Sequence, residues 1–193
     1  MANMKTKVLT VEQYEEIMET LTTGFLNCRP NKKVAFALFL EANLGIRVSD
    51  IIRLTPNSFI RNGKRYQLDI IEKKTGKART FTVPVEIMQY IREYCLNGKI
   101  ADNQIIVPLT ERAIQKQLKL VCDYLGYTGI STHSFRKFFA VNIYIDNDYD
   151  IELVKELLQH SSISITERYL DLGDKKREKA LENNIKIPKA NIF

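Results

Sequence analysis

The chain has 193 residues, which is enough to bury one sizeable hydrophobic core. Hydrophobic residues make up 45% and charged residues 27%, as in ordinary globular proteins, and every apolar run is too short to span a membrane. Cys28, Cys95 and Cys122 are far apart and odd in number, which argues against a disulfide framework or a zinc site and indicates a reduced, cytoplasmic compartment.

The first part of the chain is predicted to be helical. Thr10 and Gln13 have the spacing of a capping box, and apolar residues follow at helical intervals from Val11 to Leu21. A second helix is expected over 31–42, where a dense apolar run indicates a central place in the core.

The middle of the chain changes to β-strand spacing after Pro56. The dipeptides Asn62-Gly63 and Thr75-Gly76 are turn signals that separate three short runs rich in apolar and β-branched residues. They predict a three-stranded antiparallel meander with strands over 59–60, 66–71 and 80–83.

Helical spacing returns after the meander. Helices are expected over 87–94, 114–125, 134–145 and 151–158. We therefore predict a mainly α fold with a small three-stranded antiparallel sheet, in the α+β class. The chain is expected to form a single domain over 1–193, with 174–193 as its C-terminal tail.

Positive charge is concentrated in the predicted hairpin. The net charge of the chain is +6, and residues 61–79 hold seven basic side chains against only Asp69 and Glu72. This segment therefore carries nearly all of the excess charge, which suits a polyanionic partner such as a nucleic acid. The alternative is a solvated hairpin, because lysine and arginine are common on edge strands.

The last third of the chain holds its only two histidines. His133 and Arg136 share one helix face, so together they can present an N–H donor and a charged guanidinium to a phosphodiester. His160 precedes a short predicted helix that carries Tyr169 and that Ser161 or Ser162 would cap.

This pattern resembles the catalytic domain of the tyrosine recombinases, the phage integrase family. That family closes with a His-x-x-Arg box, a Gly-His-Ser-Ser-like turn and a tyrosine nine residues after its histidine, and Gln159 stands here where glycine is usual. Upstream, the run from Leu44 to Leu54 resembles the family's first arginine box, which contains Arg47 and Asp50. Asp50 is expected to orient the local helix or a neighbouring donor.

The resemblance implies an active site without cofactor or metal. Arg47 and Arg136 would neutralise the phosphate, His133 and His160 would donate hydrogen bonds or handle the tyrosine proton, and Tyr169 would attack phosphorus. Lys74, directly before Thr-Gly in the hairpin, would protonate the leaving 5′ oxygen. Further DNA contacts are expected from Lys73, Lys77, Arg79 and Lys137.

The function implied is that of a site-specific DNA recombinase of the integrase or invertase type, acting through a 3′-phosphotyrosyl intermediate. The alternatives are a type IB topoisomerase-like enzyme that relaxes DNA and a catalytically silent DNA-binding regulator. Expected partners are double-stranded DNA and further copies of the chain. The protein would be a monomer in solution and a homo-tetramer on paired sites. It is expected to be a cytoplasmic, nucleoid-associated protein of a bacterium or phage.

At 193 residues, the chain is not expected to include the separate N-terminal DNA-binding domain that the family usually carries. The chain is therefore expected to be either a short natural recombinase or the catalytic portion of a longer one. The apolar end of the tail, at Ile185, Ile187, Ile192 and Phe193, is expected to dock on its own domain or on a neighbouring protomer.

Overall fold

The computed structural model describes residues 6–170, which form two compact units, one up to Phe139 and the other beginning at Ala140. The predicted tail over 174–193 lies outside the described residues. Across residues 6–170, no helix combines the length and the apolar character needed to cross a bilayer. The single-domain organisation stays a prediction.

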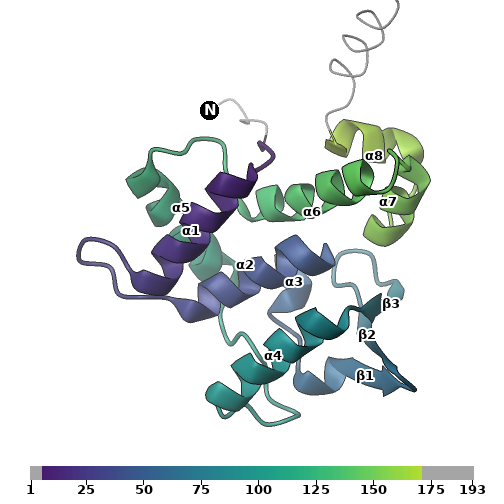
Figure 1. Ribbon diagram of the computed structural model, residues 1–193, viewed down its shortest axis with the longest axis horizontal. Coiled ribbons are helices and arrows are strands. Elements are labelled where there is room, and N and C mark those ends of the chain that lie inside the picture. The colour runs from purple at the N-terminus through teal and green to yellow at the C-terminus, as the bar shows by residue number, and fades with distance from the viewer. Residues whose placement is uncertain (1–5, 171–193) are drawn as a thin grey trace, which may run out of the picture. The chain divides into compact units, whose positions relative to one another are not determined.

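The first unit contains most of the secondary structure (Figure 1). In chain order its elements are α1 (Val11–Thr23), α2 (Lys32–Leu44), the short α3 (Val48–Ile51), the 3-10 turn η1 (Pro56–Ser58), β1 (Phe59–Asn62), β2 (Arg65–Ile71), β3 (Ala78–Val83), α4 (Val85–Asn97) and α5 (Glu111–Leu125). Helix α6 (Thr132–Asp146) runs across the boundary between the units, and α7 (Ile151–Leu158) and α8 (Ile163–Leu170) follow. The predicted mainly α fold with a small sheet is confirmed.

Local capping explains where the first helices begin. Thr10 Oγ1 accepts the Gln13 N–H at 3.2 Å, while Gln13 Oε1 accepts the Thr10 N–H at 3.1 Å, so the capping box is complete. Asn31 caps α2 in a similar way, because its side-chain oxygen accepts the Val34 N–H at 3.2 Å.

Helix α2 is the centre of the hydrophobic core of the first unit. Most of its side chains are buried, and α1 and α5 pack against it and against each other. The ring of Phe36 stacks on Tyr94 of α4 with centroids 3.6 Å apart, which joins α4 to the same core. Each large apolar side chain buried in this way contributes roughly 1.5–3 kcal/mol to stability.

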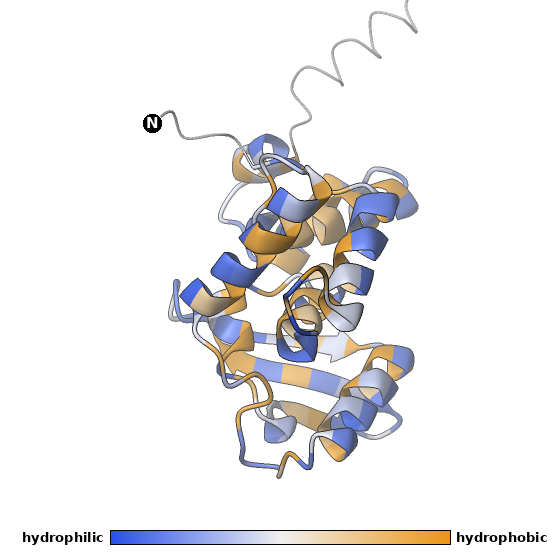
Figure 2. Ribbon diagram, turned by 90° about the vertical axis from the view of Figure 1, so that its left-hand side faces the viewer, coloured by the Kyte–Doolittle hydropathy of each residue, from blue (hydrophilic) through white to orange (hydrophobic). Residues whose placement is uncertain are grey.

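The sheet is the predicted antiparallel meander, in the order β1-β2-β3. Leu68 of β2 is wholly buried and lies opposite Phe59 of β1 and Phe81 of β3. Apolar and polar residues alternate along the strands, as the hydropathy colouring in Figure 2 shows, so one face of the sheet packs on the core. The turn between β2 and β3 carries Lys74 at its exposed tip.

The second unit continues α6 and adds α7 and α8, which pack against each other. Val154 and Leu158 are buried on one side of α7, and Thr166 and Leu170 are buried on α8. The predicted His160 lies in the connection between these two helices, and α8 carries the predicted Tyr169.

Candidate active site

A sharp corner between α2 and α3 presents the first arginine. Gly45 ends α2 in the left-handed conformation, with φ 57°, and its N–H donates to the Glu41 carbonyl at 3.1 Å. A Cβ at this position would overlap the ring of Phe139, so both the backbone conformation and the space require glycine. Two residues later Arg47 begins α3 with an extended backbone.

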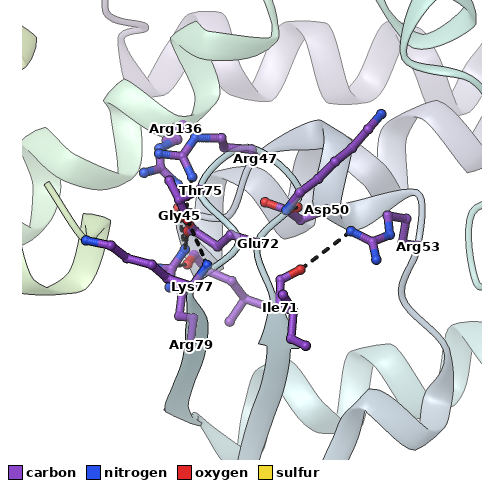
Figure 3. Close-up of polar contacts among 12 residues, drawn as sticks. Gly45, Arg47, Asp50, Arg53, Ile71, Glu72, Thr75, Lys77, Arg79 and Arg136 are labelled. Atoms are coloured by element: carbon purple, nitrogen blue, oxygen red, sulfur yellow. Dashed lines mark hydrogen bonds and ion pairs between the residues drawn. The ribbon is translucent and has the colours of Figure 1, made fainter.

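Three contacts join residues 47–53, which follow this corner, to residues 71–73, where β2 leads into the lysine-bearing turn (Figure 3). Arg47 Nη1 lies 2.7 Å from Glu72 Oε2. Asp50 Oδ1 accepts the Lys73 N–H at 2.8 Å, and Arg53 Nη1 donates to the Ile71 carbonyl at 3.5 Å. Asp50 therefore orients a neighbouring donor, one of the two roles predicted for it.

The second arginine reaches the same corner from α6. Arg136 is only 2% exposed, and its Nη1 donates to the Gly45 carbonyl, a residue 91 positions earlier in the chain. His133 lies one turn before it and keeps an exposed outer side. The predicted His133–Arg136 pair thus stands on one helix, with the arginine directed at the corner that precedes Arg47.

A third arginine, Arg79 of β3, is buried beneath this site. It is 3% exposed and donates to Glu72 Oε1 at 3.5 Å and to the carbonyls of Leu44 and Gly45 at 3.4 Å. Burial, followed by the positive charge of Arg136, lowers the pKa of Arg79 to about 10. The guanidinium groups of Arg47, Arg79 and Arg136 therefore make a concentrated positive field that favours an anion.

This field also acts on the imidazole of His133. The surrounding protein desolvates part of the ring, and the charges of Arg136, Lys74 and Arg47 add to that effect, so the pKa of His133 falls below its ordinary value. In the free protein the ring is therefore held mainly neutral at neutral pH, with one nitrogen as donor and the other as acceptor.

One acidic residue beneath the site was not singled out from the sequence. Glu41 of α2 is wholly buried, and burial raises its pKa well above the ordinary value against the opposing influence of Arg136 and the Val48 N–H. Burial thus shifts Glu41 toward its neutral form relative to an exposed glutamate. Its only signal in the sequence is an acidic residue within an apolar run.

The predicted DNA contacts divide into exposed and buried residues. Lys73, Lys74 and Lys77 are exposed on the turn, and Lys73 Nζ lies 3.2 Å from Glu111 Oε1. Arg79 points into the protein, and Lys137 is 7% exposed with its Nζ donating to the Thr6 carbonyl at 2.9 Å. Because these two side chains face protein groups, we keep only the lysines of the turn as proposed DNA contacts.

The second unit holds the predicted nucleophile beside a histidine. The rings of His160 and Tyr169 are 5.1 Å apart between centroids and nearly perpendicular, and His160 Nδ1 lies 3.1 Å from Thr166 Oγ1. Ser162 Oγ accepts the Ile165 N–H at 3.4 Å, which confirms a serine cap on α8. Gln159 ends α7 with φ 53°, so it takes the left-handed conformation that glycine usually supplies.

Arg47, Arg79 and Arg136 thus gather around the glycine corner of a mainly helical fold. Residues 7–176 match the phage integrase family, so the chain belongs to that family. Within residues 6–170, no cluster of three or more His, Cys, Asp and Glu side chains is suited to hold a metal ion.

The chain is similar to several proteins of this kind. It is 28% identical to the probable integrase/recombinase YoeC of Bacillus subtilis over 174 residues, which cover 86% of this chain and 90% of YoeC. It is 26% identical to the tyrosine recombinase XerA of Pyrococcus furiosus over 184 residues, which cover 91% of this chain and 61% of XerA.

A solved structure shows the same fold. The XerH site-specific recombinase bound to palindromic difH substrate, in a post-cleavage complex, has a TM-score of 0.68 and 20% identity to this chain. The similarity covers 93% of this chain and 53% of XerH. The chain thus spans only about half of XerH and about three-fifths of XerA.

Proposed function

We propose that the chain is the catalytic part of a site-specific DNA recombinase of the integrase or invertase type. One observation supports this proposal above the others. Arg136 of α6 donates to the carbonyl of Gly45, the residue that lies two positions before Arg47, so the two predicted arginine segments meet at Gly45. Paired guanidinium groups suit the non-bridging oxygens of a phosphodiester, because they stay charged and bond in a planar fork.

The reaction proposed is a transfer of the DNA phosphate to Tyr169. The phenolic oxygen forms a bond to phosphorus as the bond to the 5′ oxygen breaks, which leaves a 3′-phosphotyrosyl ester and a 5′ hydroxyl. Arg47 and Arg136 stabilise the negative charge that develops on the phosphate oxygens. The reverse attack by a 5′ hydroxyl of another strand rejoins the DNA, so the ester conserves the energy needed for ligation.

Proton transfers are assigned to the remaining residues. Lys74, exposed on the turn and close enough to His133 to lower that residue's pKa, protonates the departing 5′ oxygen. A neutral His133 can donate to the phosphate, and His160, whose ring lies against that of Tyr169, handles the phenolic proton.

The partner proposed is double-stranded DNA, with a protein that is monomeric in solution and tetrameric on paired sites. Membership of the phage integrase family supports DNA as the partner, and the exposed lysines of the β2–β3 turn supply charge for its backbone.

The first experiment selects the DNA site and tests the nucleophile. A pool of nicked duplexes with randomised inverted repeats is incubated with the protein, and adducts that survive SDS are recovered and sequenced. We expect Tyr169→Phe to abolish the adduct and retain DNA binding, because only the attacking oxygen is removed. Tyr144→Phe, a tyrosine of α6 in the same unit, is the matched control and should form adduct like the wild type. An undiminished adduct from Tyr169→Phe would refute the assignment.

The same reagents separate the alternatives. A topoisomerase IB-like enzyme would relax supercoiled plasmid that lacks the selected site and would exchange no strands. A silent regulator would bind duplexes without forming any adduct. A recombinase exchanges strands between two selected sites and leaves site-free plasmid supercoiled.

A further inference from the structure

Glu72 is a buried acidic residue that contacts both the first arginine segment and the lysine-bearing turn. It follows β2 directly, its side chain is wholly buried, and its Oε2 accepts from Arg47 Nη1 at 2.7 Å and from Thr75 Oγ1 at 2.9 Å. Its other oxygen, Oε1, lies 3.5 Å from Nη1 of the buried Arg79. Figure 3 shows the carboxylate between the corner of Gly45 and the turn.

The backbone of Glu72 also closes the turn that carries Lys74. The Glu72 N–H donates to the Lys77 carbonyl at 3.0 Å, and the Glu72 carbonyl accepts the Gly76 N–H at 2.8 Å. Thr75 Oγ1 bonds the Glu72 side chain and accepts the Lys77 N–H at 3.3 Å. The residue that contacts Arg47 is therefore the same residue that closes the loop around Lys74.

The charge on Glu72 is maintained by its partners. Burial alone would raise the pKa of Glu72, but the hydrogen bond and charge of Arg47, together with Thr75 and Arg79, hold it below the ordinary value. A buried carboxylate is stable only when it is paired and hydrogen-bonded, and this one has both kinds of partner. Glu72 is thus an anion, and each of its two carboxylate oxygens contacts a different arginine.

We propose, on the basis of the recombinase function above, that Glu72 is a positioning residue that holds Arg47 and the Lys74 turn in one fixed arrangement. The contact through Nη1 sets the plane of the Arg47 guanidinium, so that its other N–H groups face the phosphate in one orientation. Arg79 adds a second, buried positive charge at the other oxygen of the carboxylate.

The test compares Glu72→Gln with a matched control on the selected suicide duplex. Glu72→Gln keeps the shape of the side chain and removes its charge, and we expect adduct formation to slow by about 10- to 100-fold, the scale for a misplaced catalytic group. Binding should stay within about twofold of the wild type, because a contact inside the protein is changed. Asp69→Asn, an exposed carboxylate of β2 that accepts from Thr80 Oγ1 at 2.9 Å, should leave the rate unchanged.

Two readouts separate positioning from a general structural defect. In the Arg47→Ala background, Glu72→Gln should slow the reaction clearly less than in the wild-type protein, because one of the two groups it positions is already gone. On a duplex with sulfur in place of the bridging 5′ oxygen, the leaving group needs no proton, so the rate of Lys74→Ala should recover. Glu72→Gln should recover only in part and stay slower than the wild type, because Arg47 is still displaced. Equal slowing by Glu72→Gln with and without Arg47, or full recovery on the sulfur duplex, would overturn the proposal.

A second variant tests the proposal if Glu72→Gln fails to fold. If Glu72→Gln alone unfolds because Arg79 is left buried without its counter-charge, Glu72→Gln/Arg79→Met removes both buried charges and restores the fold. The same slowing is then expected from the double variant. A wild-type protein that forms no adduct on any duplex would refute the proposed function, whereas a wild-type rate for a folded Glu72 variant would refute this inference alone.

Discussion

Replacing Gly45 with alanine tests how the glycine corner supports the site. Two effects destabilise alanine at this position, one from the backbone conformation and one from steric overlap. The left-handed backbone at φ 57° disfavours alanine by roughly 1–2 kcal/mol, offset by roughly 0.5–1 kcal/mol of glycine's entropy in the unfolded chain. The new Cβ also overlaps the Phe139 ring, and overpacking of this kind costs about 1–3 kcal/mol. We expect Gly45→Ala to lower the free energy of unfolding by about 1.5–4 kcal/mol in total.

Gly126 provides the matched control for this prediction. It ends α5 with φ 74°, yet a Cβ there would meet no atom within 4 Å, so Gly126→Ala should show the backbone cost alone. The assay is urea unfolding followed by circular dichroism, and the difference between the two variants measures the overlap with Phe139. Phe139→Ala should recover part of the loss in the Gly45→Ala background. Equal costs for Gly45→Ala and Gly126→Ala would refute the steric argument.

Other perturbations test the second unit, the histidine and the basic turn. Gln159→Gly should raise the melting temperature of the protein, because it removes about 0.5–1 kcal/mol of net left-handed strain. In a proton NMR titration, His133 should titrate below its ordinary pKa of 6.5, and Arg136→Gln should raise that pKa by removing a neighbouring charge. Since the folded protein favours the neutral ring, His133 should stabilise the fold less as the pH falls below the unfolded pKa. Replacing Lys73 and Lys77 with alanine should lower the salt slope of DNA binding by up to about two units.

Each of these predictions has a clear contrary result. A lower melting temperature for Gln159→Gly would show that the side chain of Gln159 contributes more than its backbone costs. A His133 pKa unchanged by Arg136→Gln would remove the arginine from the causes of the shift. An unchanged salt slope would show that the two lysines of the turn meet no phosphates.

The sequence was sufficient for features that depend on neighbouring residues. Thr10 with Gln13 and Asn31 mark helix starts because a cap bonds an N–H within one turn, and Asn62-Gly63 marks a hairpin because it tolerates positive φ. The motifs around Arg47 and His133–Arg136 could also be found from local spacing, and they led to the family that the chain belongs to.

Only the tertiary structure decided which charged residues face the solvent and which support the site. Arg79 is one of several basic residues in the hairpin, and its burial depends on carbonyls of Leu44 and Gly45, which lie 35 and 34 residues earlier. Lys137 was predicted to contact DNA, but its amino group finds the Thr6 carbonyl, 131 residues away. In the sequence, Glu72 is one of two acidic residues in a basic segment. In the structure, its two oxygens contact Arg47 and Arg79. Local spacing carries no information on such partners, because the energy of a buried charge depends on groups that folding brings together from distant parts of the chain.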